Sequence, residues 1–200
     1  MMIRSLRRAA LAMTLLVTIT GCAALGGGKA PPYLLTLTAD AVPAAGAMRS
    51  SADARKLTVM VPAAPQKLRT PRIPVQQSDG AIAYVVEGQW VEAPARLFHR
   101  LLADTLAAKT GRLVIDEGLT SGSGGEQLAG QLLDFGVDAR TNEAVVVYQA
   151  MVIADAGRTI RQQRFEARSR LSVIDGRSAG DALSRAANRV AADVAQWVGD

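Results

Sequence analysis

Cysteine and histidine are almost missing from this chain of 200 residues, which contains one of each. A single cysteine cannot form a disulfide within the chain, although exported domains normally use their cysteines in pairs. One histidine and scattered acidic residues give no support to a serine-type catalytic triad. No group of histidine, cysteine and acidic residues has the spacing of metal ligands. We therefore expect no enzyme activity, no catalytic residue, no metal site and no cofactor.

Long apolar runs are also missing. The run at positions 9–19 is about eleven residues long, whereas a membrane-spanning helix needs about twenty apolar residues. Three arginines, Arg4, Arg7 and Arg8, precede this run, and no acidic residue occurs before Asp40. A basic start followed by a short apolar run is typical of an export signal. We expect residues 1–21 to be a signal peptide.

The signal ends in Ile19-Thr20-Gly21-Cys22, which is similar to a lipobox. We expect cleavage between Gly21 and Cys22, and we expect the Cys22 thiol to receive diacylglycerol, with palmitate among the acyl chains. The alternative is an ordinary cleaved signal with an incidental thiol, but lipidation explains the unpaired cysteine. A single acyl chain anchors a protein only marginally, whereas several chains hold it firmly on its membrane.

The residue after the cysteine bears on the final membrane. Ala23 occupies the position at which an aspartate retains lipoproteins in the inner membrane of enteric bacteria. By that analogy, we expect a lipid-anchored protein on the periplasmic face of the outer membrane.

The net charge of +5 depends largely on the signal. Removal of residues 1–21 takes away three of the 23 basic residues and none of the 18 acidic ones, which leaves a net charge of +2. So small an excess gives no reason to expect nucleic-acid binding.

Beyond the signal, we expect a tether and one domain. Residues 22–32 are rich in glycine, alanine and proline, as in flexible tethers. Residues 33–200 are long enough for a single domain. Its apolar patterns predict strands at 33–37, 56–61, 81–87, 112–115, 127–139, 143–154 and 158–174, and helices at 93–110 and 179–198. Prolines between positions 62 and 74 should keep that stretch irregular or extended.

The two helices have one apolar face each. The first carries Leu97, Phe98, Leu101, Leu102 and Leu106 at helical spacing, and the second carries Leu183, Ala187, Val190, Val194 and Trp197. Gly111 is a candidate C-terminal stop for the first helix, and Ser178 with Asp181 resembles a capping box for the second.

Each helix therefore needs a sheet to cover. In the predicted strands, Leu133, Phe135 and Val137 lie at alternate positions, as do Val145 and Val147, which favours antiparallel strands with one buried face. The fold class we expect is α+β, a mainly antiparallel sheet with two amphipathic helices packed on one face.

These segments carry a resemblance to a known family. The motifs are the lipobox, then Pro32-Tyr33-Leu34-Leu35, then Leu57-Thr58-Val59-Met60-Val61-Pro62, then Gln89-Trp90-Val91-Glu92-Ala93-Pro94. The chain resembles the ABC-type transport auxiliary lipoproteins, the PqiC-like family, over nearly its whole mature length. The resemblance implies a non-catalytic accessory subunit that works with the MCE-domain subunit of an ABC transport complex and moves lipids or other hydrophobic molecules between two membranes. The alternative is a stand-alone periplasmic chaperone for lipids or glycolipids.

The candidate contact surface for a partner is the strand predicted at 158–174. Arg164, Arg168 and Arg170 crowd one side of it, although a solvated sheet face explains the same pattern. We expect His99 to be a surface or boundary residue, and Trp90 and Trp197 to be packing residues. The sequence leaves the oligomeric state open, a homo-oligomer included.

Overall fold

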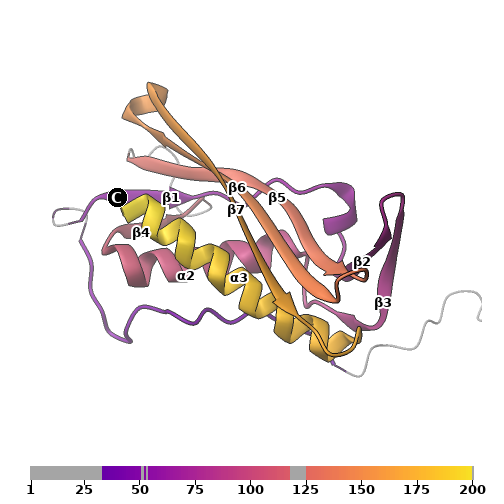
Figure 1. Ribbon diagram of the computed structural model, residues 1–200. Coiled ribbons are helices and arrows are strands. Elements are labelled where there is room, and N and C mark those ends of the chain that lie inside the picture. Colours follow the sequence, from indigo (N-terminus) through magenta and orange to yellow (C-terminus); the bar gives the residue numbers. More distant parts are fainter. Residues whose placement is uncertain (1–32, 51, 53, 118–124, 200) are drawn as a thin grey trace, which may run out of the picture. The chain divides into compact units, whose positions relative to one another are not determined.

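The computed structural model describes residues 33–50, 52, 54–117 and 125–199. Cys22, the signal and the tether lie outside the described residues. The elements within them follow one another along the chain in the colours of Figure 1. They are β1 (Lys56–Val59), η1 (Gln66–Leu68), β2 (Arg72–Ser78), β3 (Ala81–Gln89), α2 (Pro94–Thr110), β4 (Leu113–Asp116), β5 (Glu126–Asp138), β6 (Glu143–Ala154), η3 (Asp155–Gly157), β7 (Thr159–Arg170) and α3 (Gly176–Gly199).

Strand β5 is the centre of the sheet. On one side it pairs antiparallel with β6, and β6 pairs antiparallel with β7. On its other side two shorter pieces share its length: its start pairs parallel with β1, and its end pairs parallel with β2. Strand β4 extends the sheet beyond β1, and β3 extends it beyond β2.

The α+β class is confirmed, but the sheet is mixed. Within the described residues, seven strands form one sheet in which three of the six strand pairings are parallel. The antiparallel expectation holds for β5, β6 and β7, which follow one another through short turns. It fails for β1, β2 and β4, which have parallel neighbours. Alternation along a strand does not show the direction of the strand relative to its neighbours, and parallel neighbours are joined by long connections that leave no local turn signal.

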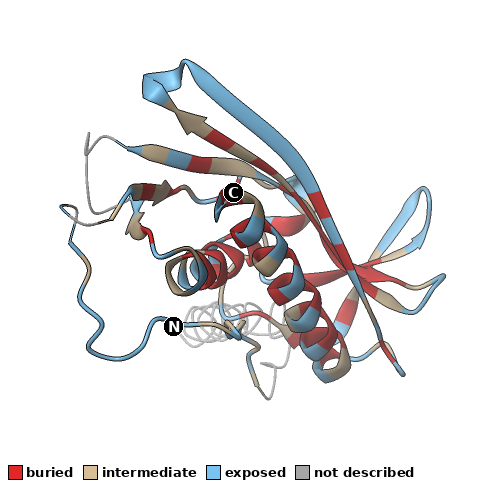
Figure 2. Cartoon of the chain, turned by 60° about the vertical axis from the view of Figure 1, so that its left-hand side comes forward, coloured by how far each residue is buried: buried red, intermediate tan, exposed pale blue. Residues whose placement is uncertain are grey.

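Both helices lie on the same side of the sheet, side by side (Figure 2). Helix α2 has a proline at its first position and ends at Gly111, whose φ of 68° places it in the left-handed region that favours glycine. Helix α3 begins at Gly176, three residues before its predicted start. Asp175, not Ser178, caps it: the Asp175 carboxylate accepts the backbone N–H of Ser178 at 2.7 Å.

The predicted strand at 33–37 is reduced to one bridge, in which Leu35 pairs with Trp90. This N-terminal segment instead crosses α3. The side-chain amide of Asn188 on α3 donates to the carbonyl of Thr38 and accepts the N–H of Asp40. Asn188 therefore satisfies backbone groups of Thr38 and Asp40, whereas those of Leu35 pair with Gln89 and Val91.

The region between β1 and β2 was expected to be irregular or extended up to Pro74, and its last part is extended because β2 starts at Arg72. Between the two strands the chain leaves the edge of β5 and forms η1, whose Leu68 is fully buried. Pro74 fits in the strand because β2 meets β5 over only two residue pairs, which begin at Val75.

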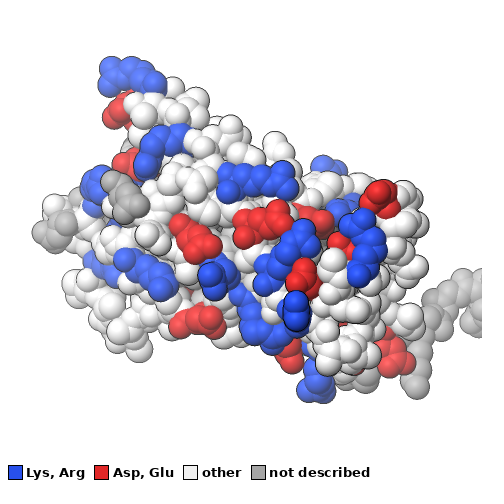
Figure 3. Space-filling view, viewed as in Figure 1, with Lys and Arg blue, Asp and Glu red and all other residues white. Residues whose placement is uncertain are grey.

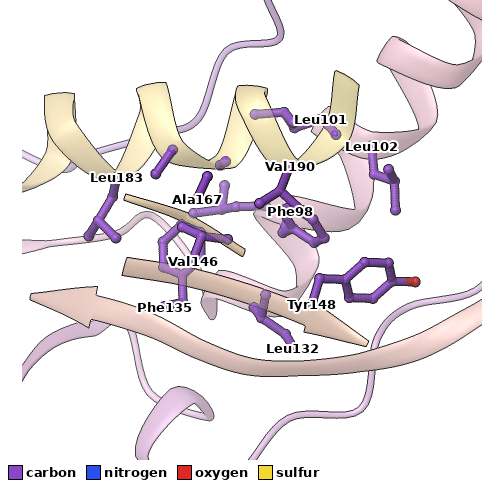
Figure 4. Packing of buried hydrophobic residues seen from close by; sticks show 14 of the residues in the cluster. Phe98, Leu101, Leu102, Leu132, Phe135, Val146, Tyr148, Ala167, Leu183 and Val190 are labelled. Atoms are coloured by element: carbon purple, nitrogen blue, oxygen red, sulfur yellow. The ribbon is translucent and has the colours of Figure 1, made fainter. Parts of the chain in front are cut away.

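The hydrophobic core fills the space between helices and sheet (Figure 4). Every apolar residue predicted for the first helix face is buried, as are those of the second except Trp197, which is partly buried. Trp90 is 1% exposed and meets the ring of Phe135 edge-on at 5.6 Å. Among the described residues, no helix has the length and hydropathy needed to cross a membrane.

Candidate interaction surface

The face of the sheet that points away from the helices carries the arginines singled out by the sequence. Along β7, Phe165 and Ala167 point into the core. Because successive side chains of a strand alternate between the two faces, Arg164, Arg168 and Arg170 share the outer face. The structure thus brings all three predicted residues together on one surface.

Acidic residues lie between these arginines. The Arg168 guanidinium donates to Glu166 at 2.9 Å and lies 3.6 Å from Glu143, and both contacts hold the pKa of Arg168 above its ordinary value, with the Glu166 hydrogen bond the larger cause. Arg164 lies 3.8 Å from Glu166, and Arg170 lies 3.9 Å from Glu143. We call these five residues the charged row. Its net charge is only +1, so it is not a strongly basic patch.

Two valines lie beneath the charged row. Val145 pairs with Arg168 across the strands, and Val147 pairs with Glu166. They are 7% and 4% exposed, yet neither belongs to the core between helices and sheet. The sequence pattern correctly placed both on one buried face, but that face is the outer one, and Val146 is the residue that points to the helices.

A groove of about 270 Å³ borders the row, with Arg168 and Val145 on its wall. Lys67 of η1 forms another wall by means of a 2.9 Å ion pair with Asp134 of β5. The groove exists because the chain leaves the sheet between β1 and β2 and, at η1, places Lys67 beside the outer face of β5. Gly136 also lines it, and a side chain there would meet the carbonyl oxygen of Pro74 at 2.6 Å.

The far end of the groove is built by the turn between β5 and β6. Arg140 donates two hydrogen bonds to the Asp138 carboxylate, at 3.0 and 2.9 Å, and one to Asp79 at 2.7 Å. The hydrogen bond from Arg140 lowers the pKa of Asp138 below its usual value, although burial opposes this. Such a two-pronged contact fixes both side chains.

The sequence reasoning did not find Lys67, Asp134, Asp138 and Arg140. A weak signal was present in Asp138-Ala139-Arg140, where opposite charges flank one residue of a turn. The pair of Lys67 and Asp134 joins residues 67 positions apart, so no local pattern shows it.

The groove contains three cations and three carboxylates, and each is held by a partner of opposite charge. Such a surface has no excess of positive charge with which to bind anions. It is suited to a partner that offers charges of both signs, as a protein surface does.

His99 does not contribute to this surface. It was expected at the surface or boundary of the domain, but it is 4% exposed, and its Nε2 lies 3.0 Å from the carbonyl oxygen of Val59. Helix α2 packs against β1 at this point, so the ring is enclosed and tied to the strand. Among the described residues, no group of three or more His, Cys, Asp or Glu side chains is placed to hold a metal ion.

These features define the class of protein: an α+β domain with two helices on one sheet face and a mixed-charge groove on the other. Solved structures share the fold. An uncharacterized protein aligns with a TM-score of 0.63 at 14% identity, over 72% of this chain and 92% of its own. Protein XCC0632 from Xanthomonas campestris, a DUF330 protein, aligns with a TM-score of 0.67 at 16% identity, over 83% of this chain and 94% of its own. No curated protein matches the chain in sequence.

Residues 33–195 match the family described as the ABC-type transport auxiliary lipoprotein component. The chain belongs to this family of auxiliary transport lipoproteins. The resemblance drawn from its sequence motifs is confirmed.

Proposed function

We propose that the protein is a non-catalytic accessory subunit that is anchored by lipid at Cys22 to the periplasmic face of the outer membrane. In this proposal it docks the MCE-domain subunit of an ABC transport complex, which moves lipids or other hydrophobic molecules between the two membranes. Membership of the auxiliary family and the lipobox sequence support this role.

The observation that carries the docking step is the outer sheet face. Val145 and Val147 are nearly inaccessible there although the helices do not cover them. The side chains of Arg164 and Arg170 remain 59% and 91% exposed at the two ends of the charged row. The accessible part of this face carries charges of both signs, which suits a partner surface of complementary charge.

Photo-crosslinking in intact cells tests the proposal. A photoreactive amino acid at position 164 or 170 should form adducts with an MCE-type protein. The matched control is position 104, because Asp104 is also exposed but lies on α2, on the other side of the sheet. Equal yields from positions 104 and 164 would mean that the outer face is not the docking surface.

A second measurement separates the accessory subunit from the lipid chaperone. The purified, lipidated protein should not extract phospholipid from vesicles in stoichiometric amounts. Stoichiometric extraction, together with no protein adduct from any labelled position, would support the chaperone instead.

A further inference from the structure

The domain begins at an end that carries exposed apolar side chains. Leu34 is 54% exposed, Val86 is 95% exposed and Val91 is 49% exposed. Two backbone hydrogen bonds tie Leu35 to β3 and the residues after it: its N–H donates to Gln89, and its carbonyl accepts from Val91. Leu34 therefore lies next to the point where the chain pairs with Gln89, Trp90 and Val91, and Val86 lies in the second half of β3, which leads to that point. We call Leu34, Val86 and Val91 the apolar patch.

Aromatic and basic side chains surround this patch. The Tyr33 hydroxyl donates to the carbonyl of Glu87 at 3.4 Å, and the Arg177 guanidinium lies 5.4 Å from the Tyr33 ring centroid. On β2, the Arg72 guanidinium lies 4.1 Å from the Tyr84 ring centroid. Tyrosine and arginine beside apolar groups are typical of surfaces that lie at the water–lipid interface.

The position of Tyr33 in the chain points to the same partner. Eleven residues separate it from the membrane end, counted from Cys22 to Pro32. A chain of that length spans about 18 Å as a random coil and at most about 38 Å when extended. A domain of this size is about 40 Å across. The end that carries Tyr33 is therefore the end of the domain that lies nearest to the bilayer.

We propose that the apolar patch contacts the phospholipid bilayer and orients the domain, with the β6–β7 hairpin pointing away from the membrane. This inference rests on the proposed lipid anchor. The anchor raises the local concentration of lipid around the patch, so a few apolar side chains are enough for contact. The opposite orientation would place the exposed tip around η3, which extends beyond the helices (Figures 1 and 2), on the lipid.

Spin labels on the lipidated full-length protein test the orientation. The protein is reconstituted in vesicles of phosphatidylethanolamine with a minority of phosphatidylglycerol. Since Cys22 is the one native cysteine and its thiol is taken up by the lipid, an engineered cysteine carries the only label. Labels in Val86→Cys and Val91→Cys should be accessible to dissolved oxygen and shielded from a water-soluble paramagnetic reagent. Labels in the exposed controls Met48→Cys and Ile160→Cys should show the reverse.

A charge in the patch provides a second readout. Val86→Asp should leave the melting temperature unchanged, because Val86 is 95% exposed, and should move the Val91→Cys label toward water. Flotation of the vesicles with the protein is measured in the same samples. Protein that floats while the labels at 86 and 91 remain wet overturns the orientation and leaves the anchor intact, whereas protein that does not float overturns both. Immobile labels without oxygen access, with a signal that grows with protein concentration, would instead place a second copy of the chain on the patch.

Discussion

Asp138 is a buried carboxylate, 8% exposed, whose principal partner is Arg140. Arg140 supplies the hydrogen bonds that lower its pKa. A carboxyl group whose pKa is lowered by folding stabilises the fold above its unfolded pKa of about 4, and this contribution is lost as the pH falls through the folded value. The contact therefore acts fully at neutral pH and vanishes in acid.

Arg140→Gln should consequently destabilise the domain at pH 7, and the difference from the native protein should shrink as the pH falls below about 4 and through the lowered folded pKa of Asp138. Thermal unfolding of the two proteins at several pH values measures this difference. The control is Asp79→Asn, because the Asp79 side chain is 95% exposed and surface pairs contribute little. A melting-temperature difference that does not shrink toward low pH would mean that Arg140 acts by packing alone.

Leu101 is 2% exposed and points from α2 into the core (Figure 4). Leu101→Asp would bury an unpaired charge and should cost several kcal/mol, enough to unfold a domain of ordinary stability. Arg96→Asp, on the exposed side of the first turn of α2, should be neutral or slightly stabilising because acidic residues suit a helix N-terminus. Circular dichroism melts of both variants check the prediction, and equal melting temperatures would contradict the observed helix face.

The start of α3 lies directly against the end of β3. The first residue of the helix, Gly176, touches Gly88: a side chain at Gly176 would meet the carbonyl oxygen of Glu87 at 2.0 Å. Two glycines permit this contact of helix backbone with strand backbone. The helix begins at Gly176 with Asp175 as its cap, so the capping-box pattern at Ser178 and Asp181 was misleading.

Gly176→Ala should therefore destabilise the domain by about 1–3 kcal/mol, the usual cost of overpacking. The matched control is Gly80→Ala, because a side chain at Gly80 has no neighbour within 4 Å. Urea unfolding of both variants measures the difference. If both lose the same stability, the close contact between α3 and β3 does not limit the side chain at position 176.

The helices were the elements most readily predicted, because their 3.6-residue period survives in Leu97 to Leu106 and in Leu183 to Val194. Strand β6 was predicted with its observed bounds. The apolar alternation that located it was nevertheless assigned to one buried face, and both faces are buried. Sequence alternation cannot distinguish a face covered by helices from a face covered by long arginine side chains, whose aliphatic parts also exclude water.

The edges of the sheet also differ in character. Strand β7 pairs only with β6 in the described residues, and its free edge is crowded with arginine and glutamine. Charged side chains on an edge strand discourage pairing with other chains. Over the face seen in Figure 3, basic and acidic side chains alternate without a large area of one sign.

The molecule as a whole was predictable in its class but not in its strand order. The order depends on β1 and β2 both pairing with β5, β1 with its start and β2 with its end, while the chain between them leaves the sheet to form η1. The groove was equally unpredictable, since its lining residues Lys67 and Arg168 are far apart in the sequence. The arginines of β7 were identified because they are close in sequence, whereas the walls of the groove depend on tertiary structure.

Two surfaces then have different tasks in the proposed arrangement. The apolar patch at the end that carries Tyr33 meets the lipid, and the outer sheet face with the charged row meets the protein partner. The two can act together because they involve different elements: β3 with the N-terminal segment for the patch, and β6 with β7 for the row. A lipid-anchored domain held in one orientation presents its docking face at a constant height, which raises the effective concentration of that face for the partner.

All of this requires the anchor, so the last prediction concerns Cys22. Cys22→Ser removes the thiol that receives the lipid, and the variant should incorporate no radioactive palmitate, whereas the native protein is labelled. The native protein should sediment with outer-membrane markers in a sucrose gradient because Ala23 follows the cysteine. Ala23→Asp provides the control, since it should keep the palmitate label and shift the protein toward the inner membrane. Palmitate labelling of Cys22→Ser would refute the lipobox, because the variant has no thiol to receive the lipid. Native protein in the inner-membrane fraction would refute the proposed location, because Ala23 is the residue from which that location was argued.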